Sequence, residues 1–283
     1  MHFNLHKKFG ALNSGPVFDA FHTGALALGH DVSIDSNAGI DVIWSVLFHG
    51  RMAGNKTIWE RCQREGRPCI VLEVGGIKRG TTWKVAINGI NRDANWGDTR
   101  NSNDDRAVSL GLKLKPWRTD GSKILICGQH DKSLQWNGMP NMSTWVLSTI
   151  DSIQKHTDRP IVFRPHPRCK LPHIEHEFNN VYRQEPQYLN GTYDDFDMGF
   201  DDVYATVSYS SNPGIHSIIE GIPAFVSSHS LAYPVANDID FFHDINNPLR
   251  PDRQQWLNDY AHTEWTLEEI SQGIPLKHLT SSL

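Results

Sequence analysis

The 283-residue sequence lacks a long apolar segment and is poor in cysteine. It has no run of about 18 apolar residues, so we expect no membrane-spanning helix and no membrane partner. The opening residues MHFNLHKKF hold neither an apolar stretch nor a small-residue cleavage site, which argues against a signal peptide. The four cysteines form no C-x-x-C pair, so we expect reduced thiols in a cytoplasmic protein, without a structural zinc site.

Charge is unevenly distributed along the chain. Residues 1–115 contain 15 Lys and Arg against 11 Asp and Glu, whereas residues 116–283 contain 12 against 21. A basic first half and an acidic second half suggest that the two halves meet different partners. The net charge of −5 shows that the chain as a whole is not a strongly basic nucleic-acid binder.

Apolar strands alternate with amphipathic helices in both halves. Helices are predicted over residues 15–29, 55–66 and 144–157. Buried strands are predicted in DVIWSVLF, PCIVLEV, KILICGQ, RPIVFRPHP, VYATVSY and PAFVSS. This alternation is typical of parallel sheets with crossover helices, so the predicted fold class is α/β.

A polar, turn-rich segment over residues 93–122 interrupts this pattern and predicts a domain boundary. We therefore predict one domain at residues 1–118 and a second at 119–248. Residues 249–283 are predicted to form a C-terminal helical segment, a long helix or a helix pair, that packs across both domains.

Three strands of the second half end in residues suited to an anion. A helix predicted to begin at Gly214 or Ile215 would point backbone N–H groups and its positive dipole end at the same region. Ser-Ser-Asn before a helix is also an ordinary N-cap, and Arg-Pro-His-Pro is also a rigid turn. Their joint occurrence favours a phosphate-containing ligand. The residues predicted to bind it are Gln129, Arg164, His166, Arg168, Ser210, Ser211, Asn212 and Gly214.

The segment SYSSNPGIHSIIEGIPAFV resembles the donor-binding motif of glycosyltransferases with two facing Rossmann-like domains, the GT-B fold. ILICGQ and IVFRPHP resemble the same domain of capsule-polysaccharide transferases of the Kdo type. The resemblance, over residues 123–228, implies a nucleotide-sugar donor, UDP-linked, as co-substrate and no cofactor. His216 stands where that family has a ribose-binding Glu, so His216 is the expected ribose contact.

The same resemblance implies that the first domain binds the acceptor and supplies a base if the reaction inverts. The candidates are Asp19, early in the first predicted helix, and Glu73 and His49, at predicted strand ends. Asp19 could instead stabilise a helix dipole, Glu73 could instead form a salt bridge, and a retaining reaction would need no such base. The residues predicted to bind the acceptor are Arg51, Lys78 and Arg79.

Segments of the first half, including PVFDAFHTGALALGHDV and VLEVGGIKRG, resemble a group of proteins encoded by tailed phages. That group resemblance implies transfer of a sugar, a pentose such as arabinose or a hexose, to 5-hydroxymethylcytosine in phage DNA. The partner would be double-stranded DNA in the host cytoplasm. Enzymes that act on a DNA base often take it out of the stack, so Trp83, Trp96 and Asn88 could contact a displaced base. Core packing is the simpler interpretation for Trp83.

Three alternatives stay open at this point. The acceptor could be a surface polysaccharide or lipid-linked glycan, the chain could bind nucleotide sugars without catalysis, or it could be an epimerase of similar form. Asp195 and Asp197 have the Asp-x-Asp spacing of a metal-binding loop, which we interpret as a solvated acidic loop. We therefore predict no metal.

Overall fold

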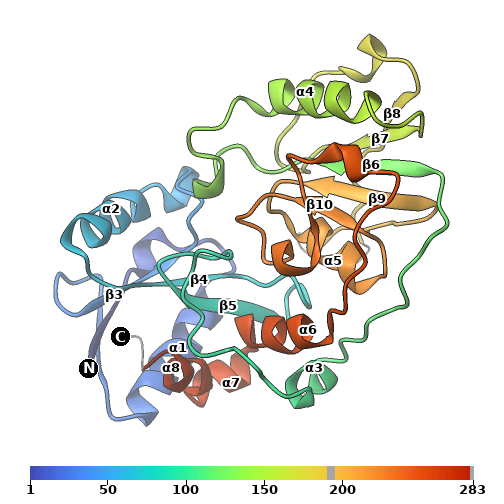
Figure 1. The fold of residues 1–283 in the computed structure, drawn as a ribbon. Helices are drawn as coiled ribbons and strands as arrows, with labels where there is room; N and C mark the ends of the chain where they lie inside the picture. The colour runs from blue at the N-terminus through green and yellow to red at the C-terminus, as the bar shows by residue number, and fades with distance from the viewer. Residues whose placement is uncertain (190–194, 281–283) are drawn as a thin grey trace. The chain divides into compact units, whose positions relative to one another are not determined.

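The computed structural model describes residues 1–189 and 195–280, and the chain forms two compact units (Figure 1). Unit 1 comprises Met1–Ser102, Lys132–Leu134 and Asp259–Leu283, and unit 2 comprises Asn103–Asp131 and Gln135–Asn258. No helix in the described part of the chain is long and apolar enough to cross a membrane.

Unit 2 begins at Asn103, ahead of the boundary predicted at residue 118. The polar segment that suggested the boundary is bound to unit 2. Lys115 and Arg118 donate backbone hydrogen bonds to the carbonyls of Ile219 and Gly221, over 2.9 and 2.7 Å.

Unit 1 contains a six-stranded sheet in the order β12-β5-β4-β3-β1-β2. Four strands are parallel, and β5 and β12 are antiparallel to their neighbours. The strands are β1 His2–Leu5, β2 Asp31–Ile34, β3 Ile40–Trp44, β4 Cys69–Val74, β5 Thr82–Ile87 and β12 Glu264–Thr266. The helices are α1 Gly15–Ala27, α2 Asn55–Glu65, α7 Leu267–Ser271 and α8 Ile274–Leu279.

Helices cover both faces of this sheet, because successive strand residues point to opposite sides. Phe3, Trp44 and Leu72 pack with α1, α7 and α8, whereas Ile43 and Val71 pack with α2. Figure 1 shows α2 on one side of this sheet and α1, α7 and α8 on the other. The helix α2 ends as its sequence predicts, with Gly66 in the left-handed conformation at φ 62°.

The C-terminal segment differs from the predicted long helix or helix pair. Helix α6, Gln254–Tyr260, is followed by a 3-10 turn and then by β12, which pairs with β5. Thr266 ends the strand and begins α7 with a capping box that it shares with Glu269. The strand was missed because its pairing partner lies about 180 residues earlier in the chain.

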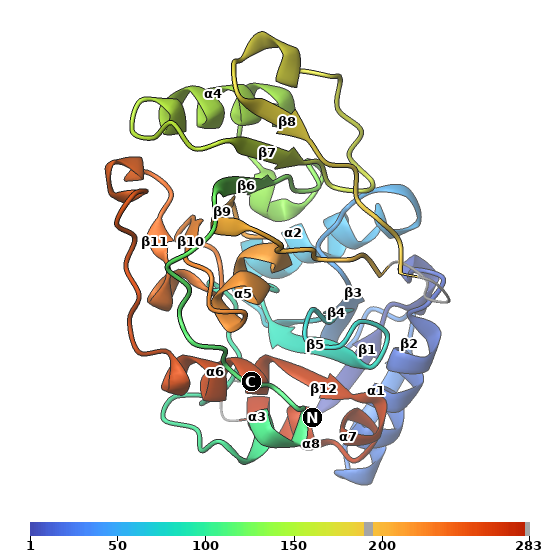
Figure 2. The same cartoon turned by 90° about the vertical axis from the view of Figure 1, so that its right-hand side faces the viewer.

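Unit 2 contains a second six-stranded sheet, in the order β11-β10-β9-β6-β7-β8, with every pair parallel (Figure 2). Its strands are β6 Lys123–Cys127, β7 Ile161–Arg164, β8 Val181–Arg183, β9 Val203–Ser208, β10 Ala224–Val226 and β11 Asn237–Asp238. Its helices are α3 Asp105–Ser109, α4 Met142–Gln154 and α5 Asn212–Ile219, and α6 begins in this unit.

The two faces of this sheet are covered by different helices. Ile124, Phe163 and Val207 pack with Trp145 and Ile150 of α4. On the other face, the Thr206 hydroxyl of β9 lies 2.7 Å from the Ser217 hydroxyl of α5. The order β9-β6-β7 sets three strand ends side by side, and the candidate site is built from the loops that follow them.

Candidate functional site

Hydrogen bonds join the loops that follow β6, β7 and β9 in unit 2. After β6, the Gly128 N–H donates to the Arg164 carbonyl of β7 over 2.8 Å. The Gln129 side-chain oxygen accepts from both the backbone N–H and the hydroxyl of Ser210, over 3.1 and 3.0 Å. The structure thus brings together the three loops that the sequence singled out.

Helix α5 begins at Asn212, two residues before the predicted start, with Ser211 as an extended N-cap. The hydroxyls of Ser208 and Ser211 are buried and have no hydrogen-bond partner among the described residues. Gly214 permits this close packing, because a Cβ there would lie 2.5 Å from the Ser208 hydroxyl oxygen. Unsatisfied hydroxyls at a helix N-terminus are donors that an anion would satisfy.

His166 lies beside this edge and is half-buried. Its Nδ1 accepts the Arg168 backbone N–H over 3.1 Å, which leaves the proton of a neutral imidazole on Nε2 and makes that nitrogen a donor. The His130 ring is 5.4 Å away, edge to face. His166 also lines a pocket with Lys170, Arg183 and the aromatic rings of Tyr188 and Phe196.

The Arg164 guanidinium is held by the protein. It donates to the Gln184 side-chain oxygen over 2.8 and 3.3 Å, to the Gly199 carbonyl over 2.7 Å and to the Met198 carbonyl. Arg164 is only 7% exposed. Its role in this structure is to fasten β7 to β8 and to the segment before β9, rather than to present a free cation.

Replacing Arg164 by Ala is therefore expected to destabilise unit 2 by about 2–3 kcal/mol, because buried acceptors lose a charged donor. If Arg164 only bound a ligand, its replacement would leave the fold intact. Urea denaturation of the variant measures it. Exposed Arg168 provides the control, and Arg168→Ala should stay within about 0.5 kcal/mol of the original. Equal stability of both variants would contradict the structural role.

Other groups near this edge have modest roles. Glu220, adjacent to the Gly-Ile-Pro turn, forms an ion pair with Lys115. Burial raises the pKa of Cys127 to about 11 although the Arg164 charge opposes it, so this thiol is a poor nucleophile at neutral pH. His216 lies half-exposed on α5.

The acidic Asp-x-Asp segment binds its own backbone. Asp195 accepts the N–H of Phe196 over 3.0 Å, and Asp197 accepts the N–H of Gly199 over 2.9 Å. These contacts are typical of turn-forming aspartates. They agree with an acidic loop more closely than with a preformed metal site.

In unit 1, Glu73 is half-buried near the end of β4. One oxygen accepts the Ser45 hydroxyl over 2.5 Å, and the other accepts the Val74 N–H over 2.7 Å. Ser45 follows β3 with φ 64°, a left-handed conformation that is costly outside glycine. Lys84 lies directly opposite Glu73 in the β4–β5 pairing.

Two buried charges that the sequence analysis missed support this region. Burial lowers the pKa of Lys84, against the opposing charges of Glu264 and Glu73. Glu264 of β12 is fully buried and accepts the N–H groups of Gly76 and Ile77 over 2.7 and 2.8 Å. Glu264 thereby fixes the start of the loop between β4 and β5, which contains the segment GGIKRG. No sequence signal connects Glu264 to that loop, since they are 187 residues apart.

The remaining predicted residues of unit 1 lie nearer the surface. Asp19 is exposed on α1 and pairs with Lys7 over 2.6 Å. His49 and Arg51 are exposed around the short 3-10 turn Gly50–Met52. In the loop between β4 and β5, Lys78 is exposed and Arg79 half-buried.

A second cluster that the sequence analysis missed surrounds Asp41 of β3, which is 1% exposed. His6 Nε2 lies 2.7 Å from its carboxylate, an Arg61 nitrogen 2.9 Å, the Cys62 sulfur 3.2 Å and an Arg67 nitrogen 3.4 Å. Burial would raise the pKa of Asp41, but the hydrogen bonds from His6, Cys62 and Arg61 outweigh it and hold the pKa well below its usual range.

Comparison with solved structures places this architecture among known folds. The chain described as Thermosulfurimonas dismutans KpsC, beta Kdo 2,7 transferase, matches with a TM-score of 0.51 and 16% identity, over 98% of this chain and 100% of that one. The chain described as Thermosulfurimonas dismutans KpsC, beta Kdo 2,4 transferase, matches with a TM-score of 0.53 and 12% identity, over 93% and 90%. This chain has a GT-B fold.

The predicted α/β class is thereby confirmed. No protein-family model and no curated protein matches the sequence. At this level of identity the similarity shows the fold, and the activity has to be argued from the residues.

Proposed function

We propose that this protein is a glycosyltransferase whose activated-sugar donor binds through its phosphate at the carboxyl edge of the unit 2 sheet. The observation that carries the proposal is the pair of buried, unsatisfied hydroxyls of Ser208, the last residue of β9, and Ser211, the N-cap of α5. The transferases with which the chain shares its fold support the reaction class. A nucleotide diphosphate donor, UDP-linked, remains the prediction from the sequence.

In this proposal the residues of unit 2 stabilise the leaving group. The Ser211 hydroxyl and the positive end of α5 would neutralise charge that develops on the departing phosphate. The Nε2–H of His166 would donate a further hydrogen bond, and Gln129 would hold the Ser210 loop in place. His216, one turn into α5, is the proposed ribose contact.

For an inverting transfer, Glu73 is the candidate base that best fits the geometry of unit 1. Its carboxylate is oriented by Ser45 and Val74 and is half-buried, whereas Asp19 is exposed and paired with Lys7. A base has to be ionised and held in place before it can accept a proton from an acceptor hydroxyl. The hydrogen bonds from Ser45 and Val74 hold the Glu73 carboxylate in one orientation.

The proposed acceptor is a glycan hydroxyl, as the names of the two structural neighbours suggest. Transfer to 5-hydroxymethylcytosine in DNA is the second candidate, carried by the resemblance to phage proteins. Charge supports a DNA acceptor less than residues 1–115 implied, because unit 1 is less basic than that segment. The acidic residues 259–283 belong to unit 1, which holds 14 Lys and Arg against 13 Asp and Glu. Trp83 and Trp96 are buried in the described structure, as core residues are.

A transfer assay tests the proposal. The protein would be incubated with UDP-linked pentoses and hexoses and with nucleotide-activated Kdo, each with a glycan acceptor or with hydroxymethylcytosine-containing DNA. Mass spectrometry of the products would identify donor and acceptor together. Donor binding without transfer to either acceptor would favour a non-catalytic binding protein. Neither binding nor transfer would refute the proposed donor site.

Replacing His166 by Ala is expected to weaken donor binding about 10- to 100-fold, because a hydrogen bond to a charged phosphate is lost. Isothermal titration calorimetry measures the change. His156, exposed at the end of α4, provides the control, and His156→Ala should bind donor as the original does. An unchanged affinity in His166→Ala would remove this histidine from the donor site.

A further inference from the structure

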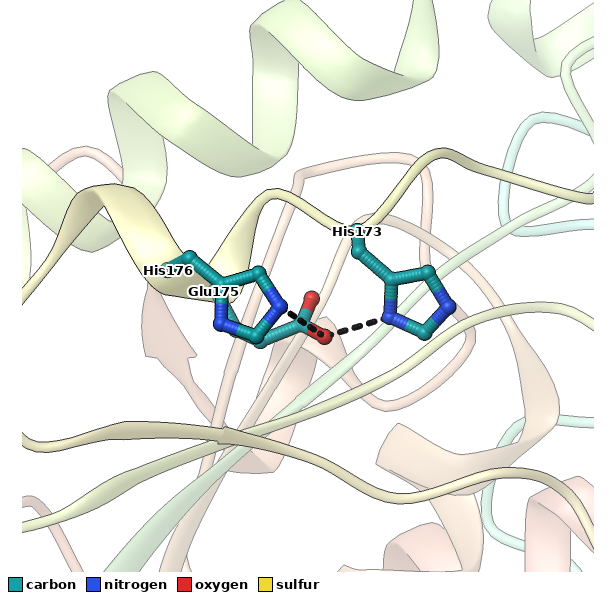
Figure 3. Close-up of side chains that lie close together, drawn as sticks. All are labelled: His173, Glu175 and His176. Carbon is teal, nitrogen blue, oxygen red and sulfur yellow. Dashed lines mark hydrogen bonds and ion pairs between the residues drawn. The ribbon is translucent and has the colours of Figure 1, made fainter.

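A short segment between β7 and β8 brings two histidines and a glutamate together (Figure 3). The sequence there is Pro-His-Ile-Glu-His, residues 172–176, and Glu175 begins the 3-10 turn Glu175–Glu177. Ile174 is 4% exposed and packs into the core of unit 2. With Ile174 anchored in the core, the side chains on either side of it gather around the Glu175 carboxylate.

The three side chains converge on one point. His173 Nδ1 lies 2.6 Å from Glu175 Oε1, and His176 Nε2 lies 3.9 Å from the same oxygen. One ligand atom from each residue lies within 4.8 Å of the other two. Ligands of tetrahedral Zn²⁺, at about 2.0–2.2 Å from the metal, lie roughly 3.3–3.6 Å from one another. Small side-chain rotations would therefore reach coordination geometry.

The glutamate is incompletely satisfied where it stands. Its side chain is only 9% exposed, and Oε2 has no hydrogen-bond partner among residues 1–189 and 195–280. The nearest cation, Arg183, lies 3.9 Å from Oε2 and is engaged elsewhere. Arg183 pairs with Glu185 and donates to the carbonyls of Pro172 and Leu171 over 3.1 and 3.3 Å. A bound cation would stabilise a buried carboxylate whose second oxygen has no hydrogen-bond donor.

We propose that His173, Glu175 and His176 bind a divalent transition-metal ion, with Zn²⁺ as the preferred occupant. His173 Nδ1, Glu175 Oε1 and His176 Nε2 would be the ligands, and water would complete the tetrahedron. Two imidazoles with one carboxylate suit zinc, whereas Ca²⁺ and Mg²⁺ prefer sites made of oxygen. Metal binding at His173 Nδ1 would displace the hydrogen bond to Glu175, and the neutral imidazole would then carry its single ring proton on Nε2.

The local structure is prepared for such a site. The two imidazoles are 67% and 79% exposed, so they can turn toward the metal without disturbing the core. The carboxylate, in contrast, is fixed by burial and by the turn. The bound ion would fasten the segment that follows Arg164-Pro165-His166-Pro167. This site does not depend on the proposed transferase activity.

Metal binding by the full chain, without an affinity tag, tests the proposal. After dialysis against Zn²⁺ and then metal-free buffer, elemental analysis should find one zinc per chain. Co²⁺ in place of zinc should give the intense visible absorption of a tetrahedral site. His173→Ala and His176→Ala should each weaken Zn²⁺ binding at least about tenfold.

The matched control is His243→Ala. His243 is an exposed histidine of the same unit whose Nε2 lies 3.3 Å from the Asp244 carboxylate, and its loss should leave Zn²⁺ affinity unchanged. Both test histidines are exposed, so their variants should fold, which circular dichroism would verify. Equal zinc content in the original, His173→Ala and His176→Ala proteins would overturn the proposal. A weak Co²⁺ spectrum of octahedral type would also overturn it.

Discussion

Replacing Glu73 by Gln is expected to lower the turnover of sugar transfer by about 10²–10⁴-fold, the usual contribution of a general base. Gln keeps the size of the side chain and an oxygen that can accept the Ser45 hydroxyl, so the fold of unit 1 should persist. The variant loses the ability to take a proton and the negative charge that faces Lys84. Steady-state kinetics with the donor and acceptor identified by the transfer assay would measure the change.

The affinity for donor provides an internal check on this variant. The proposed donor residues belong to unit 2 and Glu73 to unit 1, so calorimetry should find the dissociation constant within about twofold of the original. Asp19→Asn is the matched control, since it also neutralises one carboxylate of unit 1, and its turnover should stay within about threefold. Full activity in Glu73→Gln together with a loss in Asp19→Asn would transfer the role to Asp19.

The second large effect is expected at Asp41. Asp41→Asn should destabilise the protein by about 3 kcal/mol, because it removes the buried carboxylate that Arg61, Arg67 and His6 contact around β3. The midpoint of urea denaturation would report the loss. Asp19→Ala is the control, because its pair with Lys7 is exposed and should contribute less than about 1 kcal/mol. Similar losses in the two variants would show that burial does not strengthen the Asp41 cluster.

The Asp41 cluster also predicts how stability depends on pH. The pKa of Asp41 is lower in the folded protein than the value of about 3.9 in an unfolded chain. The contribution of ionised Asp41 to the free energy of unfolding is therefore fully present above about pH 4. It is lost as the pH falls below that value toward the folded-state pKa. The difference in stability between the original and Asp41→Asn should accordingly shrink in acid. A constant difference from pH 6 to pH 3 would contradict this assignment.

Much of the fold could be predicted because local patterns agree with the tertiary structure. Apolar runs such as CIVLEV become buried parallel strands, and Gly66 ends α2 where the sequence places a stop. The strand β5 was not predicted, because Lys84 interrupts its apolar pattern. Lys84 can be buried because the carboxylates of Glu264 and Glu73, which lie elsewhere in the sequence, stabilise its charge. The strand β12 exists through its pairing with β5, which a local pattern cannot show.

The candidate site shows the same division between local and distant information. Neighbouring parallel strands end at one edge, so the loops after β6, β7 and β9 could be expected to meet. The partners of Arg164 could not be foreseen, because Gln184 follows β8 and Gly199 lies in the segment before β9. The proposed zinc ligands could not be predicted from the spacing of cysteines, because they are two histidines and a glutamate.

The burial of Glu264 against the loop between β4 and β5 has a consequence for synthesis on the ribosome. Strand β5 is complete once Ile87 has emerged, but its outer partner β12 ends at Thr266. At 5–20 residues per second, β5 would wait on the order of 10–40 s as an unpaired sheet edge. During that interval, while unit 2 is translated, the edge of β5 could pair with other strands and the loop between β4 and β5 lacks its contact with Glu264. Because β12 is made so late, we expect the edge of β5 to need protection from aggregation, for example by a chaperone, until β12 pairs with it.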